Sequence, residues 1–273
     1  MACAQHARSV PIEAAVFHPE PRPGTIIAVT PEFAAAAAKR PVRELDNAWS
    51  TCPRTLRRAR LLELPGWAFY VAGRGGVLGD DVRPDTVAAA IGVISPDAVR
   101  AGWEAARKVG PGEVAASRLA ECARWGDEHL ADLTDVGALV TLAERVVAAA
   151  EAVAMPLFAA SRAMPMPDGG PGARAALLAH LMREHRAGAL LVAVRACRLS
   201  PVEAIIAGPE GEEEAIAFGW QPPFPARTPL IRRYTFAEAL ADRVAGQAYA
   251  ALTAPERVDL VRLLTAAAAL TRV

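Results

Sequence analysis

The chain has 273 residues with 30 basic and 30 acidic side chains, so its net charge is zero, and 53% of its residues are apolar. This length fits one large domain or two small ones, and either can bury a substantial core. Zero net charge weighs against a dedicated nucleic-acid binder, whose domain usually carries a basic excess. Alanine is abundant, and all but two of the basic residues are arginine. An alanine-rich composition favours helices.

The four cysteines argue against metal and disulfide frameworks. Cys3, Cys52, Cys122 and Cys197 lie far apart and form no CxxC pair, which a thiolate zinc site or a dense disulfide scaffold would show. No stretch of 18 apolar residues occurs, and the first residues contain no apolar run typical of a signal peptide. We therefore predict a cytoplasmic protein with no membrane span, no metal and no cofactor.

The first third of the chain predicts an extended arm followed by helices. Residues 1–24 contain four prolines and predict an arm, and residues 25–29 (TIIAV) fit a short strand or a helix entry. A helix is predicted to start at Pro31, because proline and Glu32 suit a first turn. Residues 39–60 are unusually basic, and residues 54–63 predict a helix. Residues 66–79 (GWAFYVAGRGGVLG) predict an aromatic stretch that runs into a glycine loop.

The rest of the chain predicts helix after helix. The expected helices cover residues 84–92, 96–108, 112–133, 135–153, 173–197, 201–207, 236–252 and 255–270. The prolines and glycines of residues 165–171 predict a firm break. Residues 210–214 predict an acidic surface loop, and residues 221–229 a proline-rich linker. The predicted fold is all-α with a minor strand pair at most. It divides into an arm (1–24), a helical core (25–220) and a C-terminal helical segment (221–273).

The densest charged motif is Arg183-Glu184-His185-Arg186, with His180 upstream. On a helix, His180 and Glu184 share a face, whereas His185 points about 100° away from Glu184. Three residues separate His180 from Glu184, so this is not the spacing of a zinc protease. One interpretation is a general base at Glu184 with a general acid at His185. The alternative is a solvated, salt-bridged helix face.

Arg74 lies among glycines in residues 73–79 (GRGGVLG). Glycines permit a close backbone approach, and an arginine there suits a carboxylate or a phosphate. The dinucleotide fingerprint is not completed, because Leu78 stands where its last glycine belongs. The alternative interpretation is a tight turn between helices.

Two weaker candidates lie near the start. The basic residues 39–60 could attract an anionic ligand or nucleic acid. They carry only Trp49 as a stacking aromatic, so a surface helix whose arginine stems cover apolar area is the competing interpretation. Either Glu20 or Glu32 could line a pocket, although each equally suits a helix N-terminus. Glu32 and Asp46 are lower-ranked catalytic candidates.

Several segments in order resemble the actinobacterial SalK/EvbL-like family, which is often labelled helix-turn-helix. The resemblance covers residues 65–220 and has a plausible start at residues 30–32. It is carried by residues 70–79 (YVAGRGGVLG), 156–167 (PLFAASRAMPMP), 181–186 (LMREHR) and 218–220 (FGW), and by Trp103. Residues 39–62 then look like a basic insertion. The resemblance implies a helical fold with winged-helix-like elements, and a role in natural-product tailoring or in regulation.

The chain also departs from the family at five positions that are polar there. These positions hold Val93, Met155, Ser161, Gly188 and Leu190 in this sequence. The charged residues at positions 74 and 184–186 remain. The resemblance therefore implies a site that has been partly dismantled or rebuilt for another substrate.

Three functions remain open at this stage. The leading hypothesis is a cofactor-independent tailoring enzyme that performs acid–base cyclisation, elimination or condensation on a small polar, anionic substrate. Its catalytic candidates are Glu184, His185, Arg74, Glu32 and Asp46, and its substrate-binding candidates are Trp67, Tyr70, Ser161, His180, Arg183 and Arg186. The first alternative is a DNA-binding or ligand-sensing regulator, which zero net charge opposes. The second is a non-catalytic partner of a neighbouring biosynthetic enzyme. A homodimer is also considered.

Overall fold

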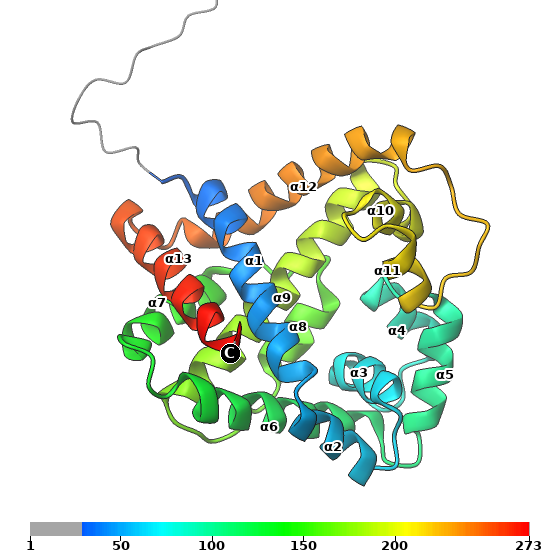
Figure 1. The fold of residues 1–273 in the computed structure, drawn as a ribbon, viewed down its shortest axis with the longest axis horizontal. Coiled ribbons are helices and arrows are strands. Elements are labelled where there is room, and N and C mark those ends of the chain that lie inside the picture. Colours follow the sequence, from blue (N-terminus) through cyan, green and yellow to red (C-terminus); the bar gives the residue numbers. More distant parts are fainter. Residues whose placement is uncertain (1–28, 273) are drawn as a thin grey trace, which may run out of the picture.

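The computed structural model describes residues 29–272 (side chains through 271) and is entirely helical over that range, with thirteen α-helices, two short 3-10 helices and no strand (Figure 1). The all-α prediction is confirmed. Within the described residues no strand pair or β-wing is present. The predicted arm (1–24) and all but Val29 of the predicted strand lie outside the described residues, and Val29 belongs to no helix.

Proline at the first helical positions explains why so many boundaries are readable from the sequence. It fixes φ near its helical value and lacks an N–H that would be unpaired there. The helices that begin in this way are α1 (Pro31–Ser50), α2 (Pro53–Leu61), α4 (Pro84–Ile91), α5 (Pro96–Ala106), α6 (Pro111–Leu130), α8 (Pro156–Ala163), α9 (Pro171–Ala196) and α10 (Pro201–Ala207).

The remaining helices are α3 (Gly66–Gly75), α7 (Val136–Ala149), α11 (Glu212–Ala217), α12 (Thr228–Tyr249) and α13 (Ala254–Ala269), with the 3-10 helices η1 (Gly76–Leu78) and η2 (Leu270–Arg272). Two predicted loops are wrong here. The predicted glycine loop, which ends the stretch of residues 66–79, is helical, as the last turn of α3 and the 3-10 helix η1, and three of the five residues of the predicted acidic loop (210–214) belong to α11. Helix α12 also begins inside the predicted linker.

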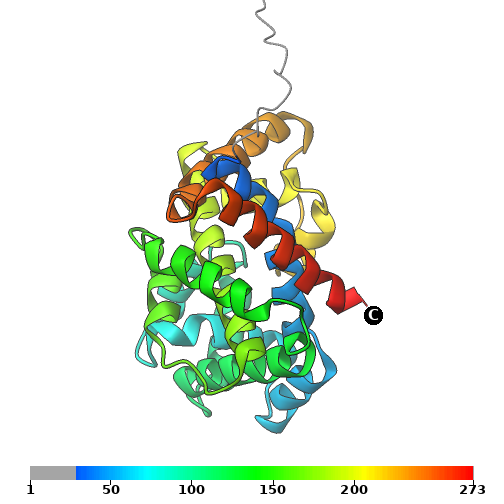
Figure 2. The same cartoon turned by 90° about the vertical axis from the view of Figure 1, so that its left-hand side faces the viewer.

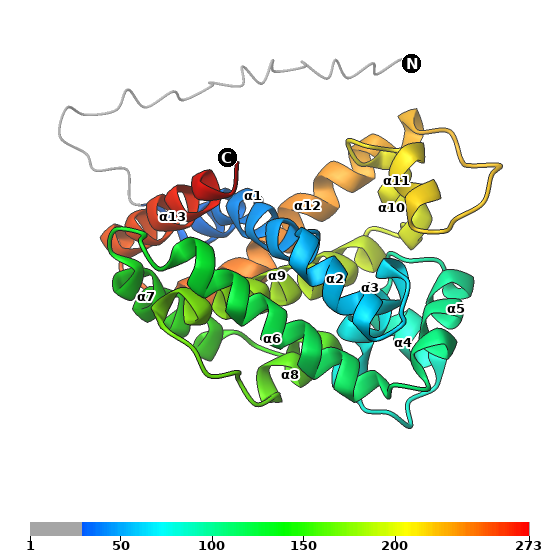
Figure 3. The same ribbon diagram turned by 60° about the horizontal axis from the view of Figure 1, so that its bottom comes forward.

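Helix α9 is the centre of the molecule. It packs against α1, α6, α7, α8 and α12 (Figures 1 and 3). Its buried residues are spread round the helix instead of forming one stripe, as expected for a helix covered on several sides. Helices α1 and α12 pack directly on α9, and α13 packs on α1 and α7 (Figure 2).

Helices α3, α4 and α5 form a smaller group that has its own apolar cluster, which includes Val87, Ile91, Val99 and Trp103. This group meets α6 through α3 and meets α8 through α4 and η1. Residues 39–62 form the second half of α1 and all of α2, and they contribute buried Leu45, Asp46 and Trp49 to the molecule. None of the helices within residues 29–272 is both long enough and apolar enough to cross a bilayer.

Candidate functional site

Arg74 and Glu184 form a buried ion pair between α3 and α9. Arg74 Nε and Nη2 donate to the two carboxylate oxygens of Glu184, each at 2.9 Å, and each side chain is only 2% exposed. Two parallel hydrogen bonds of this kind are the strongest form of an arginine–carboxylate contact. The two residues that the sequence singled out separately therefore meet.

Arg183 joins this pair to two further groups. Its Nη1 donates to Glu184 Oε1 at 2.6 Å, and its Nη2 donates to the Tyr70 hydroxyl at 3.0 Å. Its Nε lies 3.3 Å from a carboxylate oxygen of Asp46. Arg183 is 21% exposed at its side chain, so the network reaches solvent here.

Asp46 anchors the other end of the network from α1. The carboxylate is 2% exposed and accepts from Trp49 Nε1 at 3.2 Å, and His180 Nδ1 lies 2.7 Å from it. The Trp49 and His180 rings meet edge to face, with centroids 5.6 Å apart. Asp46 is a lower-ranked catalytic candidate of the sequence, and the structure places it beside two of the other candidates, His180 and Arg183.

Sequence reasoning missed Arg118, which lies at the centre of the same region. Its guanidinium carbon is 4.3 Å from the centroid of the Trp49 ring and 5.2 Å from that of Tyr70, and it is 2% exposed. Its Nη2 has no hydrogen-bond partner. A Cβ at Gly73 would lie 2.3 Å from Arg118 Cδ, so glycine makes room for this side chain. Gly73 therefore indicates close packing against Arg118 and not a phosphate-binding loop.

These residues form one buried charge network, made of Asp46, Tyr70, Arg74, Arg118, His180, Arg183 and Glu184. It holds three guanidinium groups against two carboxylates. Burial alone would raise the pKa of each carboxyl, but Arg183 and His180 at Asp46, and Arg74 and Arg183 at Glu184, hold both values well below their usual range. Burial likewise acts to raise the pKa of Tyr70, yet the neighbouring guanidinium groups lower it.

A cavity of about 370 Å³ adjoins the network on the side of α4 and α8. We call it the α9 cavity. Among the described residues that line it, Arg74, Glu184 and Arg195 are the only ones with polar side chains. The rest of this lining is apolar and comes from α4 (Ala89, Ala90), residues 154–158 and α9 (Ala187, Gly188, Leu191, Val192). A volume of this size falls in the range of small-molecule sites.

Two of the family departures meet in the wall of this cavity. A Cβ at Gly188 would lie 2.7 Å from Met155 Cγ, so the methionine occupies the space that a side chain at position 188 would need. Both positions are polar in the resembled family. Two of the five positions at which the sequence departs from the resembled family therefore meet in the wall of the α9 cavity.

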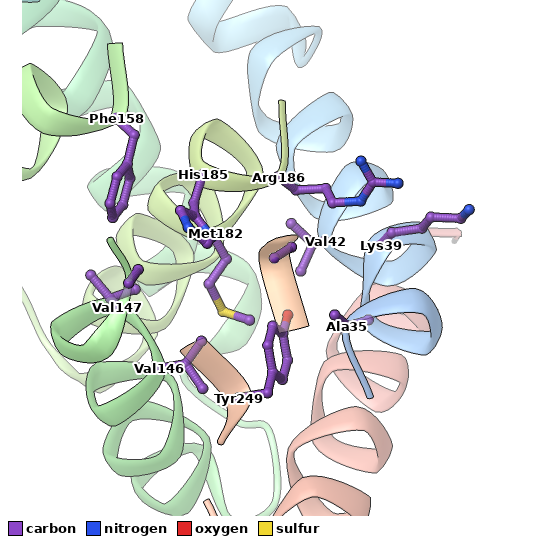
Figure 4. A pocket seen from close by; sticks show the side chains of 13 residues that line it. Ala35, Lys39, Val42, Val146, Val147, Phe158, Met182, His185, Arg186 and Tyr249 are labelled. Carbon is purple, nitrogen blue, oxygen red and sulfur yellow. The ribbon is translucent and has the colours of Figure 1, made fainter. Parts of the chain in front are cut away.

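His185 and Arg186 lie on another side of α9 from Glu184. They border a second cavity of about 20 Å³, the size of a single water molecule, together with Lys39, Met182 and Tyr249 (Figure 4). Burial is the main cause that lowers the pKa of His185, whose ring packs on Phe158. His185 and Glu184 thus open onto different cavities.

The remaining candidates are scattered. Arg186 Nη2 donates to Glu238 at 2.8 Å and to Asp242 at 2.9 Å. Glu32 is exposed in the first turn of α1. Trp67 is half-buried and stacks on Tyr70, and Ser161 is buried in α8 but lines neither cavity. No group of three side chains suited to a metal ion occurs within the described residues.

Helices α4 and α5 are joined by the short connection of residues 92–95, and α4 lines the α9 cavity. Gly92 ends α4 with φ of +74°, a conformation that favours glycine. The connection is fixed by Trp220 Nε1, which donates to the Val93 carbonyl at 2.8 Å. On α5, Arg100 donates to Asp97 and Asp85 at 2.6 and 3.1 Å, so acidic partners offset its charge.

A family model described as a helix-turn-helix family matches residues 34–228, which include α4, α5 and all the residues of the network and of the α9 cavity. No curated protein and no solved structure matches the chain.

Proposed function

The chain belongs to this helix-turn-helix family, and from that premise we propose that it binds a small anionic molecule in the α9 cavity. The observation that carries the proposal is the Arg74 guanidinium in the cavity wall, which belongs to a network of three guanidinium groups and two carboxylates. A buried surplus of positive charge is costly unless an anion compensates it.

A stabilisation screen with the purified full chain tests the proposal. A ligand that binds only the folded state raises its stability by about 2.7 kcal/mol when present at a hundred times its Kd. We expect members of a broad panel of small carboxylates and phosphates to raise Tm. The variant Ala187→Trp fills the cavity from α9 and should abolish the response.

A matched variant controls for the added tryptophan. Ala266→Trp places the same side chain on an exposed position of α13 and should keep the response. The proposal is wrong if no compound stabilises the wild-type chain, or if the stabilisation persists in Ala187→Trp.

A second candidate function is a ligand-sensing DNA-binding regulator. It is favoured by the family description and by the α4–turn–α5 geometry, because α4 also lines the α9 cavity. Fluorescence anisotropy with a duplex from the upstream region of the gene is the test. Affinity that falls steeply between 50 and 200 mM salt supports it, and no binding at low salt refutes it.

Acid–base tailoring chemistry has less support than binding. A carboxylate held by two guanidinium groups is a weak base, because the contacts that lower its pKa also stabilise the ionised form. His185 opens onto the other cavity. Membership in the SalK/EvbL-like branch remains our proposal, supported by the meeting of Arg74 with Glu184. A homodimer or a partner biosynthetic enzyme is tested by co-purification with proteins encoded nearby.

A further inference from the structure

We propose that the ligand of the α9 cavity is an apolar monocarboxylate, an inference that rests on the proposed binding function. The polar side chains in the lining are two arginines and one glutamate. Arg74 and Glu184 balance one another, and both belong to the adjoining network, whose three guanidinium groups exceed its two carboxylates by one positive charge. A single negative charge on the ligand balances that surplus.

The rest of the lining determines the body of the ligand. Within residues 29–272 it contains no hydroxyl, amide or imidazole side chain, and its apolar walls are alanine, glycine, leucine, valine, proline, phenylalanine and methionine. A ligand hydroxyl placed against these walls would lose its hydrogen bonds to water without replacement. An alkyl or aryl body would instead gain from burial, at about 25 cal/mol per Å² of apolar surface. This differs from the small polar substrate that the sequence suggested.

The carboxylate is assigned to Arg74 and not to Arg195. Glu184 occupies Nε and Nη2 of Arg74, and Nη1 is buried without any hydrogen-bond partner. A ligand carboxylate would supply that partner. Arg195 is exposed, and its Nη1 donates to the Leu199 carbonyl at 3.0 Å. Its charge is therefore screened by water and contributes little to a specific contact.

Calorimetry with compounds of matched length tests the ligand class. The compounds are octanoate, octanol, octylammonium and octyl phosphate, with gluconate as a hydroxyl-rich monocarboxylate. We expect octanoate to bind at least tenfold more tightly than each of the others. Equal or tighter binding of gluconate or octanol overturns the class, even where the cavity itself binds ligands.

Three variants test the anchor. Arg74→Met should weaken octanoate binding about 100-fold, because it removes a buried charged partner, whereas Arg195→Met should change it less than threefold. Glu184→Gln leaves Arg74 in place and removes the competing negative charge, so octanoate should bind about tenfold more tightly. That variant keeps the test decisive if Arg74→Met does not fold.

The outcomes separate this inference from the function beneath it. If Arg195→Met loses octanoate binding while Arg74→Met keeps it, the carboxylate lies at Arg195 and the assignment to Arg74 is overturned. Weaker octanoate binding in Glu184→Gln also overturns it. If no compound of any class binds the wild-type chain, the proposed function itself is wrong. It is also wrong if the compounds that bind do so equally well to Ala187→Trp.

Discussion

Replacing Asp46 by asparagine should destabilise the protein strongly while preserving the shape of the side chain. The oxygen of the introduced amide could still accept from Trp49, but Arg118 would lose its counter-charge and Arg183 would lose one of the two carboxylates that it contacts. Breaking a buried ion pair by removing one partner costs about 3–5 kcal/mol. For a chain of this size each kcal/mol lowers Tm by roughly 2–4 °C, so we expect a decrease of about 10 °C.

Urea unfolding followed by circular dichroism measures the change, with Asp97→Asn as the control. Asp97 also pairs with an arginine, but its side chain is 92% exposed, so its replacement should cost less than about 0.5 kcal/mol. Adding Arg118→Met to Asp46→Asn should recover part of the loss, since it removes an uncompensated cation. A loss below about 1 kcal/mol in Asp46→Asn would refute the reasoning that charge compensation holds the network together.

Three further predictions follow from the same region and from its surroundings. Acid should destabilise the protein, because the pKa values of Asp46 and Glu184 are lower in the folded state than in the unfolded state. The stability that these two carboxylates contribute is complete above their unfolded pKa values of about 4 and is lost as the pH falls below them. Urea midpoints that do not change between pH 6 and pH 3 would contradict this. Gly73→Ala should lower the free energy of unfolding by about 1–3 kcal/mol, because the new Cβ would lie 2.3 Å from Arg118 Cδ. The control Gly137→Ala has open space around its new Cβ and should leave the stability unchanged or raise it. Equal unfolding midpoints for the two variants would count against the packing argument. Burial raises the pKa of the Cys122 thiol, so an aromatic disulfide reagent should modify it only after unfolding, and mass spectrometry of the native protein showing a modified Cys122 would disprove this.

The helices were largely predictable from the sequence because their starts are marked locally. Proline at the first positions of α4, α5, α6 and α10 gave boundaries within a few residues. Helix α1 was predicted only at its start, because Pro41 and the following arginines obscured its continuation to Ser50. Its tertiary contacts with α9, α12 and α13 override the local cost of an internal proline.

The glycines at the end of α3 and the start of η1 were wrongly predicted as a loop, because their role depends on distant contacts. Locally, Gly73, Gly75 and Gly76 indicate a loop, since glycine weakens a helix. In the structure a Cβ at these positions would collide with Arg118, Val87 and the Pro111 backbone respectively. The glycines are therefore needed for close helix packing, a requirement set by partners that are distant in sequence.

The candidate site was predictable only in part. Arg74 and Glu184 could be selected as charged residues, but their contact spans 110 positions and no local pattern encodes it. Arg118 was hidden among many arginines, most of which a composition rich in arginine would place on the surface. The placement of His185 on a different side of α9 from Glu184, in contrast, followed from helical geometry.

The long separation of these partners also has a consequence for how the chain folds. The contacts of Glu184 with Arg74 and of His180 with Asp46 join positions 110 and 134 residues apart, and both depend on α9. Contacts of such high sequence separation close large loops, so they form late and slow the reaction. Until α9 is synthesised and docked, the helices that supply Asp46, Arg74 and Arg118 hold two guanidinium groups against one carboxylate. Glu184 of α9 supplies the second carboxylate, which pairs with Arg74. Helix α9 therefore sets the order of assembly, since the earlier helices can complete their charged interior only around it.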